Sequence, residues 1–430
     1  MNGKIYDEYV SILKEELVPA MGCTEPIAIA YAAAKVRKTL GCLPERVAIQ
    51  ASPNIIKNVK SVIVPHTGSL RGIEAAAAAG IVAGCADAGL QVLSQVTPEE
   101  AAAIADYLSR TDCRVKPSDN GYVFYISVSV WGGGHRASIE IAGSHTHIIH
   151  LRKDDEILFH CDYSEQKASC QTDRSLLNIA DIVDFANTVR ISDIEDIIER
   201  QISCNTAIAE EGLQHDWGAN IGSILLRSYG NSVHNRAKAY AAAGSDARMS
   251  GCELPVVINS GSGNQGLTAS LPVMIYAKEL DVGKDLLYRA LALSNLVTIH
   301  LKTGIGPLSA YCGATSAGCG AGAGITYLYG GGYKEIAHTI VNALAINSGM
   351  ICDGAKPSCA AKIASAVEAG LLGMQMENHD RQFYDGEGIV VKGVENTIRN
   401  VGELARNGMK ETDKVIIHLM TDGVGDSGCQ

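Results

Sequence analysis

The sequence predicts an α+β protein, in which a mixed α/β N-terminal region is followed by a mostly helical C-terminal domain. Two periodicities predict this: apolar residues tend to alternate between residues 46 and 161, and helical spacing dominates beyond Leu176. The composition agrees, because 47% hydrophobic residues can bury a large core. The 45 glycines, set against 4 phenylalanines, indicate closely packed helices and glycine-lined loops.

The N-terminal region, residues 1–170, begins with a helical segment over residues 1–40. One helix is expected to run to about Pro19 and a second from Thr24 to Leu40. Strands are then expected where alternating or β-branched runs are broken by Gly, Pro, Asn and Asp, at residues 46–52, 61–65, 122–130, 136–142 and 145–151. Helices are expected between these strands at residues 73–89 and 98–108.

The second domain, residues 171–430, is predicted to be helical to about Gly373 and to end in a short α/β tail at residues 413–420. No Pro- or Ser-rich linker separates the two domains. The boundary at residues 165–175 therefore rests on the change of pattern alone.

Charge and hydropathy limit the classes of partner that this protein is expected to bind. A net charge of −11 is opposite to the basic footprint of a nucleic-acid-binding surface. The longest apolar run, residues 75–86, is shorter than the roughly 20 residues of a membrane span. The N-terminus reads as an acidic amphipathic helix and not as a signal peptide. We expect a cytoplasmic protein that binds neither nucleic acid nor membrane, and the sequence leaves open whether it forms a homo-oligomer.

Cysteine spacing in the helical half is the strongest chemical signal. Cys312 and Cys319 stand seven residues apart in one glycine-rich segment, and Cys352 and Cys359 stand seven apart in another. Structural zinc sites usually place only about two to four residues between paired ligands. Iron–sulfur clusters accept wider and more varied spacings. The spacing favours a cluster over zinc, and it leaves open that these cysteines are buried structural side chains.

Cys23 lies in the segment GCTEP, residues 22–26, just before an apolar helix. Thr24 is the expected N-cap, and Pro26 suits the first turn. At this position the helix dipole favours the thiolate and would lower the pKa of the Cys23 thiol. Such a thiolate could be a ligand, a nucleophile or a base. The alternative is a cysteine that merely precedes a capped helix.

A glycine-rich turn, residues 259–266, lies between a strand-like run and a helix. Successive backbone N–H groups in such a turn can bind an anion. The turn also matches G-x-G-x-x-G, but no second strand with an acidic end follows, so a nicotinamide oxidoreductase is disfavoured. We expect the turn to bind a substrate carboxylate, although an ordinary glycine-rich helix entry is the alternative. The candidate residues are Ser260, Gly261, Ser262, Gly263, Asn264 and Gln265.

Histidines offer a weaker signal. His145 and His147 would share one face of a strand and could bind a metal together with His150. A solvated or hydrogen-bonded face explains all three as well or better. The turn at His66 and the one at residues 53–54 are polar segments where substrate groups are often contacted, but their spacing proves nothing.

Four motifs together resemble the L-cysteine desulfidase family, which is related to the alpha chains of iron–sulfur-dependent bacterial L-serine dehydratases. They are GCTEP (22–26), SGSGNQG (260–266), IGPLSAYCGA (305–314) and MICDGAKPSCAAK (350–362). The resemblance covers nearly the whole chain. It implies a 4Fe-4S cluster with Cys312, Cys352 and Cys359 as ligands, and a catalytic base at Cys23, on the N-terminal helical segment that faces the cluster. Cys319 is not among the family's ligands, and the tail around Cys429 does not clearly match a C-terminal cysteine found in some serine dehydratases.

The resemblance implies a lyase that eliminates sulfide from L-cysteine to give pyruvate, ammonia and sulfide. Three cysteine ligands leave one iron open as a Lewis acid, and a positioned base removes the α-proton. The glycine-rich turn would stabilise the developing charge. Two alternatives stay open. An L-serine dehydratase would use the same cluster to eliminate hydroxide, and a non-catalytic iron–sulfur redox sensor would need neither Cys23 nor the turn.

Overall fold

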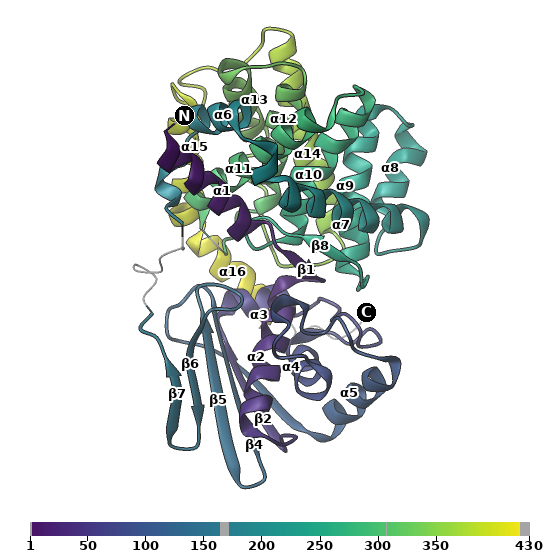
Figure 1. The fold of residues 1–430 in the computed structure, drawn as a ribbon, viewed down its shortest axis with the longest axis vertical. Helices are drawn as coiled ribbons and strands as arrows, with labels where there is room; N and C mark the ends of the chain where they lie inside the picture. The colour runs from purple at the N-terminus through teal and green to yellow at the C-terminus, as the bar shows by residue number, and fades with distance from the viewer. Residues whose placement is uncertain (1, 164–171, 307, 422–430) are drawn as a thin grey trace.

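A computed structural model describes residues 2–163, 172–306 and 308–421. Two parts follow one another along the long axis: a sheet with its covering helices, and a larger helical part (Figure 1). Each part has its own large cluster of buried hydrophobic side chains. The predicted α+β fold is confirmed. None of the described helices combines the length and the apolar character that crossing a bilayer requires.

The six-stranded sheet has the order β3-β2-β4-β5-β6-β7. Its strands are β2 (Arg46–Ala51), β3 (Asp112–Pro117), β4 (Tyr125–Gly132), β5 (His135–Ala142), β6 (Ile148–Lys153) and β7 (Glu156–His160). Among the described strands, only β2 and β3 pair in parallel, and the segment between them holds α3 (Pro53–Val59), α4 (Gly72–Ala83) and α5 (Pro98–Arg110). Alternate residues of β2 and β4 are buried against α2 (Thr24–Leu40), so the residues between them point to the opposite face.

The helical part is built on small residues. A Cβ atom on Gly318 of α12 would lie 2.2 Å from the carbonyl oxygen of Ala366 on α14, so a larger residue could not keep this contact. The same holds for Gly370, whose Cβ would lie 2.2 Å from the oxygen of Gly318. The helices are α6 (Ile179–Thr188), α7 (Glu195–Gln214), α8 (Ile221–Tyr229), α9 (Val233–Met249), α10 (Gly263–Glu279), α11 (Lys284–Ile305), α12 (Gly313–Leu328), α13 (Tyr333–Ile346), α14 (Cys359–Asn378), α15 (Val394–Glu403) and α16 (Lys410–Thr421).

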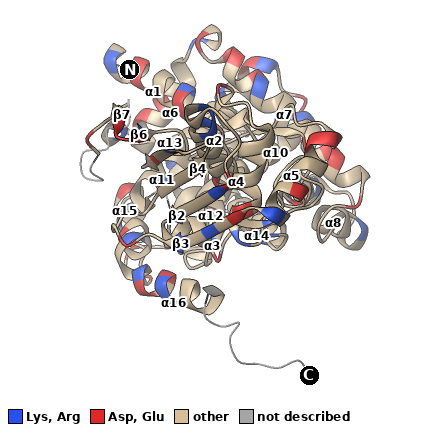
Figure 2. Ribbon diagram, turned by 90° about the horizontal axis from the view of Figure 1, so that it is seen from below, with Lys and Arg blue, Asp and Glu red and all other residues tan. Residues whose placement is uncertain are grey.

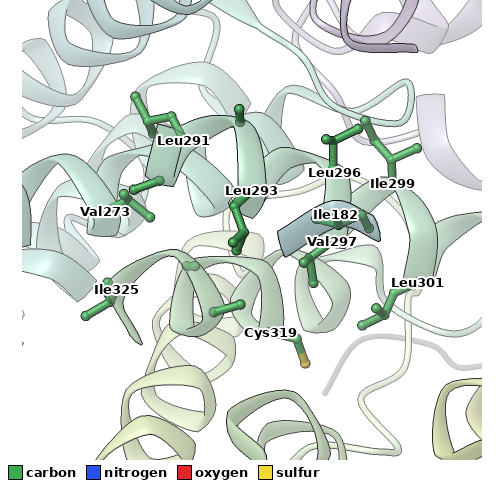
Figure 3. Close-up of a cluster of buried hydrophobic side chains, with 14 of the residues drawn as sticks. Ile182, Val273, Leu291, Leu293, Leu296, Val297, Ile299, Leu301, Cys319 and Ile325 are labelled. Carbon is green, nitrogen blue, oxygen red and sulfur yellow. The ribbon is translucent and has the colours of Figure 1, made fainter. Parts of the chain in front are cut away.

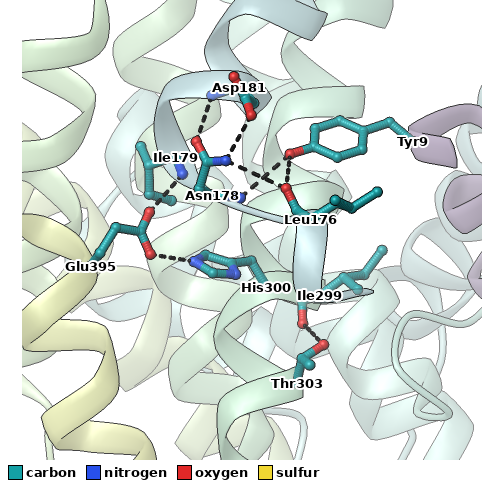
Figure 4. Close-up of polar contacts among 9 residues, drawn as sticks. All are labelled: Tyr9, Leu176, Asn178, Ile179, Asp181, Ile299, His300, Thr303 and Glu395. Atoms are coloured by element: carbon teal, nitrogen blue, oxygen red, sulfur yellow. Dashed lines mark hydrogen bonds and ion pairs between the residues drawn. The ribbon is translucent and has the colours of Figure 1, made fainter. Parts of the chain in front are cut away.

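The first helix, α1 (Gly3–Glu16), belongs to the core of the helical part. Tyr9, Ile12 and Leu13 are fully buried there. The Tyr9 hydroxyl donates to the Leu176 carbonyl oxygen at 2.9 Å, beside the side chain of Asn178 that caps α6 (Figure 4). The predicted helical segment 1–40 is thus divided: α1 packs with the helices and α2 with the sheet. The chain crosses between the parts in β1 (Pro19–Met21), which pairs with β8 (Pro255–Val257).

Three local predictions were wrong. Residues 61–65 form a single β-bridge, between Ile63 and Arg71, because the turn that follows folds the chain back within a few residues. His145 and His147 precede β6, so they do not share a strand face. Residues 413–420 lie in α16, where Ile416 is buried and Val415 and Leu419 are exposed, since a short apolar run does not by its period distinguish a helix from a strand.

Candidate active site

Cys23 is the residue immediately before α2, whose predicted bounds Thr24–Leu40 are confirmed. The N-cap is Cys23 itself and not Thr24, and no side chain caps the helix. The Thr24 hydroxyl instead donates to the carbonyl oxygen of Gly261 at 2.7 Å. The N-terminus of α2 therefore contacts the glycine-rich turn, more than two hundred residues further along the chain.

The Cys23 thiol is buried and donates to Glu25 Oε2 at 3.0 Å. Burial, followed by the negative charge of Glu25, raises the pKa of the Cys23 thiol well above its usual value. The prediction that the helix dipole lowers this pKa is wrong, because burial and the carboxylate together outweigh it. Burial opposes ionisation of Glu25 as well, but His145, Cys23 and Asn58 hold the pKa of Glu25 below its usual value. The result is a neutral thiol beside a carboxylate.

The glycine-rich turn enters α10 earlier than predicted, at Gly263. The backbone N–H groups of Gly263, Asn264 and Gln265 are the first three of the helix, so they have no partner within it. Arg248 closes one side of the turn: its Nη1 donates to Asn264 Oδ1 at 3.0 Å. A Cβ on Gly263 would lie 2.3 Å from Arg248 Nε, so only glycine lets the guanidinium approach.

Buried polar atoms without a hydrogen-bond partner among the described residues gather around Cys23 and the turn. They are Asn58 Oδ1, His145 Nε2, Arg248 Nε and Gln265 Oε1. Native proteins leave few such atoms unsatisfied. This concentration indicates a site shaped for a polar ligand.

His145 lies against the glycine-rich turn. A Cβ on Gly261 would lie 3.0 Å from His145 Cε1, and burial lowers the pKa of this imidazole. The solvated face that the sequence favoured for His145 is therefore wrong. His66 pairs with Glu253 at 2.9 Å, and its turn packs against Gly22, where a Cβ would lie 2.4 Å from Pro65.

Arg248 is the site residue that sequence reasoning missed. It occupies the last turn of the alanine-rich helix α9, and nothing in its local pattern distinguishes it from an ordinary helix-end cation. Its contacts with the turn come from packing between α9 and α10. Only the tertiary structure therefore identifies it.

The two cysteine loops are joined by backbone hydrogen bonds. Cys312 N donates to Met350 O at 2.9 Å and Cys352 N donates to Ala310 O at 2.6 Å. Cys312 precedes α12, and Cys359 begins α14. The loops thus bring together thiols that are forty residues apart in sequence.

The thiols of Cys312 and Cys352 lie close enough to shift each other's pKa. The interaction with Cys312 lowers the pKa of Cys352, and the positive charges of Lys57 and Lys362 act in the same direction. The pair raises the pKa of Cys312, and burial adds to this. Nearby Lys302 is buried, which lowers its pKa to about 8. Thiolate character is thus favoured at Cys352, whereas Cys312 and Cys359, whose pKa values are raised, favour the neutral thiol.

Cys359 connects the loops to Cys23. Both cysteines belong to one small buried cluster together with Val62 and Met249. The loop between Cys352 and Cys359 packs on α3, because a Cβ on Gly354 would lie 2.5 Å from the carbonyl oxygen of Lys57. The three predicted ligands and Cys23 thus lie in one region, at the junction of the two parts.

Cys312, Cys352 and Cys359 offer the soft sulfur donors that an iron–sulfur cluster takes. Over the described ranges, no three His, Cys, Asp or Glu side chains are grouped as the ligands of one ion would be. A cluster spreads its thiolate ligands over several irons, so the sulfurs need not meet at one point. Cys312, Cys352 and Cys359 suit that arrangement. Cys319 does not join them, since it lies on α12 in the apolar core of the helical part (Figure 3).

The model of the serine dehydratase alpha chain family matches residues 87–418, which include the glycine-rich turn and both cysteine loops. This chain belongs to that family. The family match begins after Cys23.

Relatives extend the similarity over nearly the full length. A UPF0597 protein of Desulfitobacterium hafniense is 58% identical and covers 97% of each chain. One from Lachnoclostridium phytofermentans is 50% identical, over 97% of this chain and 100% of its own. One from Treponema denticola is 46% identical, over 96% and 98%.

Proposed function

We propose that this member of the serine dehydratase alpha chain family is an iron–sulfur-dependent lyase that eliminates sulfide from L-cysteine. The observation that supports it is the convergence of Cys23, the glycine-rich turn and the two cysteine loops around buried, unpartnered polar atoms. Each element contributes a function that such an elimination needs: a proton acceptor, an anion site and soft metal ligands.

The substrate carboxylate would bind at the start of α10. Its negative charge suits the free backbone N–H groups of Gly263, Asn264 and Gln265 and the positive end of the helix dipole. Arg248 adds a buried guanidinium, with Nε free among the described residues to form a charge-assisted hydrogen bond. Ser260, Gly261 and Ser262 would shape the turn that presents these donors.

Cys23 would accept the α-proton of the substrate. As a neutral thiol it must first lose its own proton, and the 3.0 Å hydrogen bond to Glu25 Oε2 provides the acceptor. The thiolate formed in this way takes the proton from the α-carbon. Thr24, bonded to Gly261, holds this helix end against the carboxylate site.

Cys312, Cys352 and Cys359 would hold a 4Fe-4S cluster, and the cationic side chains of Lys57 and Lys362 would offset its thiolate charge. When bound, the cluster would supply a Lewis acid, at the iron without a cysteine ligand, for the departing sulfur. The C–S bond breaks to give aminoacrylate and sulfide, and water converts aminoacrylate to pyruvate and ammonia. Cys429, the other cysteine considered near the cluster, lies outside the described residues.

L-Serine is the second candidate substrate, and the family match favours it. The same residues would then eliminate hydroxide. Thiolate is the better leaving group and the softer iron ligand, which is why we place cysteine first. A redox sensor is disfavoured, because it has no use for Arg248 or for the Cys23–Glu25 pair.

The test is an anaerobic assay of the iron-loaded protein with L-cysteine and L-serine in parallel, following pyruvate, ammonia and sulfide. We expect the three products from cysteine in equal amounts, and a higher kcat/KM for cysteine than for serine. A serine value equal to or above the cysteine value would assign the chain to the dehydratases. Absence of turnover with both substrates in iron-loaded protein would reject the lyase.

A further inference from the structure

The face of the sheet that points away from α2 carries a groove of about 360 Å³. It is lined by four cationic side chains from three strands, Arg46, Arg114, Lys116 and Arg136. Figure 2 colours the ribbon blue at every Lys and Arg and red at every Asp and Glu. This volume lies within the range of small-molecule sites, roughly 300–1,000 Å³. The groove is separate from the candidate active site, which lies beyond the N-terminal end of α2.

Among the described residues, only one of the groove's four cations has an acidic partner. None of the described lining residues is a carboxylate. Arg114 pairs with Asp112 at 2.9 Å, whereas no ion pair is found for Arg46, Lys116 or Arg136 within the described part of the chain. Holding like-charged cations close together costs electrostatic free energy when no carboxylate offsets them. Such a group is unusual in a chain whose net charge is −11.

Trp131 orders two of these side chains. It pairs with Arg46 on one neighbouring strand and with Arg136 on the other, so the three residues form a row across the sheet. The guanidinium carbons lie 3.9 Å (Arg46) and 5.3 Å (Arg136) from the centroid of the indole ring. Stacking of this kind fixes the guanidinium forks in position, which lowers the entropy lost when they bind a ligand.

We propose that this groove binds a free, multiply phosphorylated small molecule of about nucleotide size. Arginine forks match phosphate oxygens in pairs, and the hydroxyls of Ser127 and Ser129 add neutral donors to the lining. A basic groove on a chain whose net charge is −11 suits a compact anion, because a long polyanion that reached beyond the groove would meet the excess of acidic groups on the rest of the chain. The proposal does not depend on the lyase function, and either can fail without the other.

The proposed phosphate site is tested by calorimetric titration of the full-length protein. Tripolyphosphate and ATP are titrated separately, at low and at moderate salt. We expect one site per chain and an affinity that falls as salt rises. Lys116→Gln and Arg136→Gln should each weaken binding by on the order of tenfold, the usual worth of a charge-assisted hydrogen bond. Stronger binding of ATP than of tripolyphosphate would identify a nucleotide, and equal binding would identify the phosphates as the recognised group.

Arg152→Gln is the matched control, since Arg152 is on β6 of the same sheet, does not line the groove and already pairs with Asp155 at 3.0 Å. Its affinity should stay within about twofold of wild type, as expected for a surface change away from the site. Three outcomes would overturn the proposal: no heat with either probe, equal weakening by the control, or binding of a single-stranded oligonucleotide alone. A shift of oligomeric state in the groove variants would also overturn it, by making this face a contact between copies.

Discussion

Cys23 shows how much the neighbours of one side chain decide its chemistry. The start of a helix should favour its thiolate, yet Glu25 lies 3.0 Å away and the thiol is buried. Both effects favour the protonated form. If Cys23 transfers a proton, Glu25 must therefore take part. The position of Cys23 at the start of a helix would not by itself have indicated this.

Replacing Cys23 with Ala should abolish turnover and leave the visible iron–sulfur spectrum intact. The proposed role is proton transfer, and a general base typically contributes about 10²–10⁴-fold. Anaerobic kinetics together with iron analysis measure both quantities in one preparation. Thr24→Ser, which keeps the hydroxyl that bonds Gly261, serves as the control with near-normal activity. Loss of iron in the Cys23 variant would instead make it a ligand.

The four cysteines of the two glycine-rich segments, Cys312, Cys319, Cys352 and Cys359, should separate into two classes. Cys352→Ala should remove most of the iron, because Cys352 lies in a joined loop with thiolate character. Cys319→Ala should keep it, since this side chain contacts only the apolar core. Iron per chain in anaerobically purified protein is the measurement. Stoichiometric zinc without iron in the wild type would exclude the cluster altogether.

Helices α2 and α4 pack closely because a glycine on α4 leaves room for the backbone of α2. A Cβ on Gly80 of α4 would lie 2.1 Å from the carbonyl oxygen of Ala30 on α2, too close for any real contact. The close approach fixes the position of α2, and with it the position of Cys23 at its start. Helix packing thereby sets the geometry of the candidate site.

Gly80→Ala should destabilise the protein despite the better helix propensity of alanine. Overpacking of this kind typically costs about 1–3 kcal/mol, more than the roughly 1 kcal/mol that alanine gains in a helix. Urea unfolding measures the change, and we expect kcat to fall as α2 shifts. Gly349→Ala is the control, because a Cβ there meets nothing within 4 Å. Equal stability of the two variants would contradict the packing argument.

In the whole molecule, the division into two parts does not follow the order of the elements along the chain. α1 is the first element in sequence, yet Tyr9, Ile12 and Leu13 belong to the core of the helical part. The glycine-rich turn follows β8, which pairs with β1 just before Cys23. The site thus lies at the junction of the two parts, with elements of both.

Leu13→Ala should destabilise the helical part by about 2–5 kcal/mol, as expected for a large-to-small core substitution. The chain has two tryptophans, Trp131 on the sheet and Trp217 in the helical part, so single-tryptophan variants report each part separately. In a Trp131→Phe background, urea unfolding seen at Trp217 should move to lower denaturant. Ser11→Ala on the exposed face of α1 should have little effect. A shift seen only at Trp131 would place α1 with the sheet.

Local pattern determined much of this protein. The bounds of α2, four of the six strands of the sheet to within a few residues, and the helical character beyond Leu176 follow from periodicity and from Gly, Pro and Asn breaks, whereas β3 and β7 were not predicted. Motif resemblance selected the cysteines and the glycine-rich turn as candidates for the site. These features are carried by neighbouring residues, which is why the sequence alone reveals them.

Tertiary structure decided the rest. It placed α1 in the helical core, made residues 413–420 a helix, buried His145 beside Gly261 and brought Arg248 to the glycine-rich turn. It also reversed the expected pKa shift of Cys23 by burying the thiol beside Glu25. Each of these outcomes depends on how side chains are buried and charges are placed when distant segments pack together. No window of neighbouring residues contains that information.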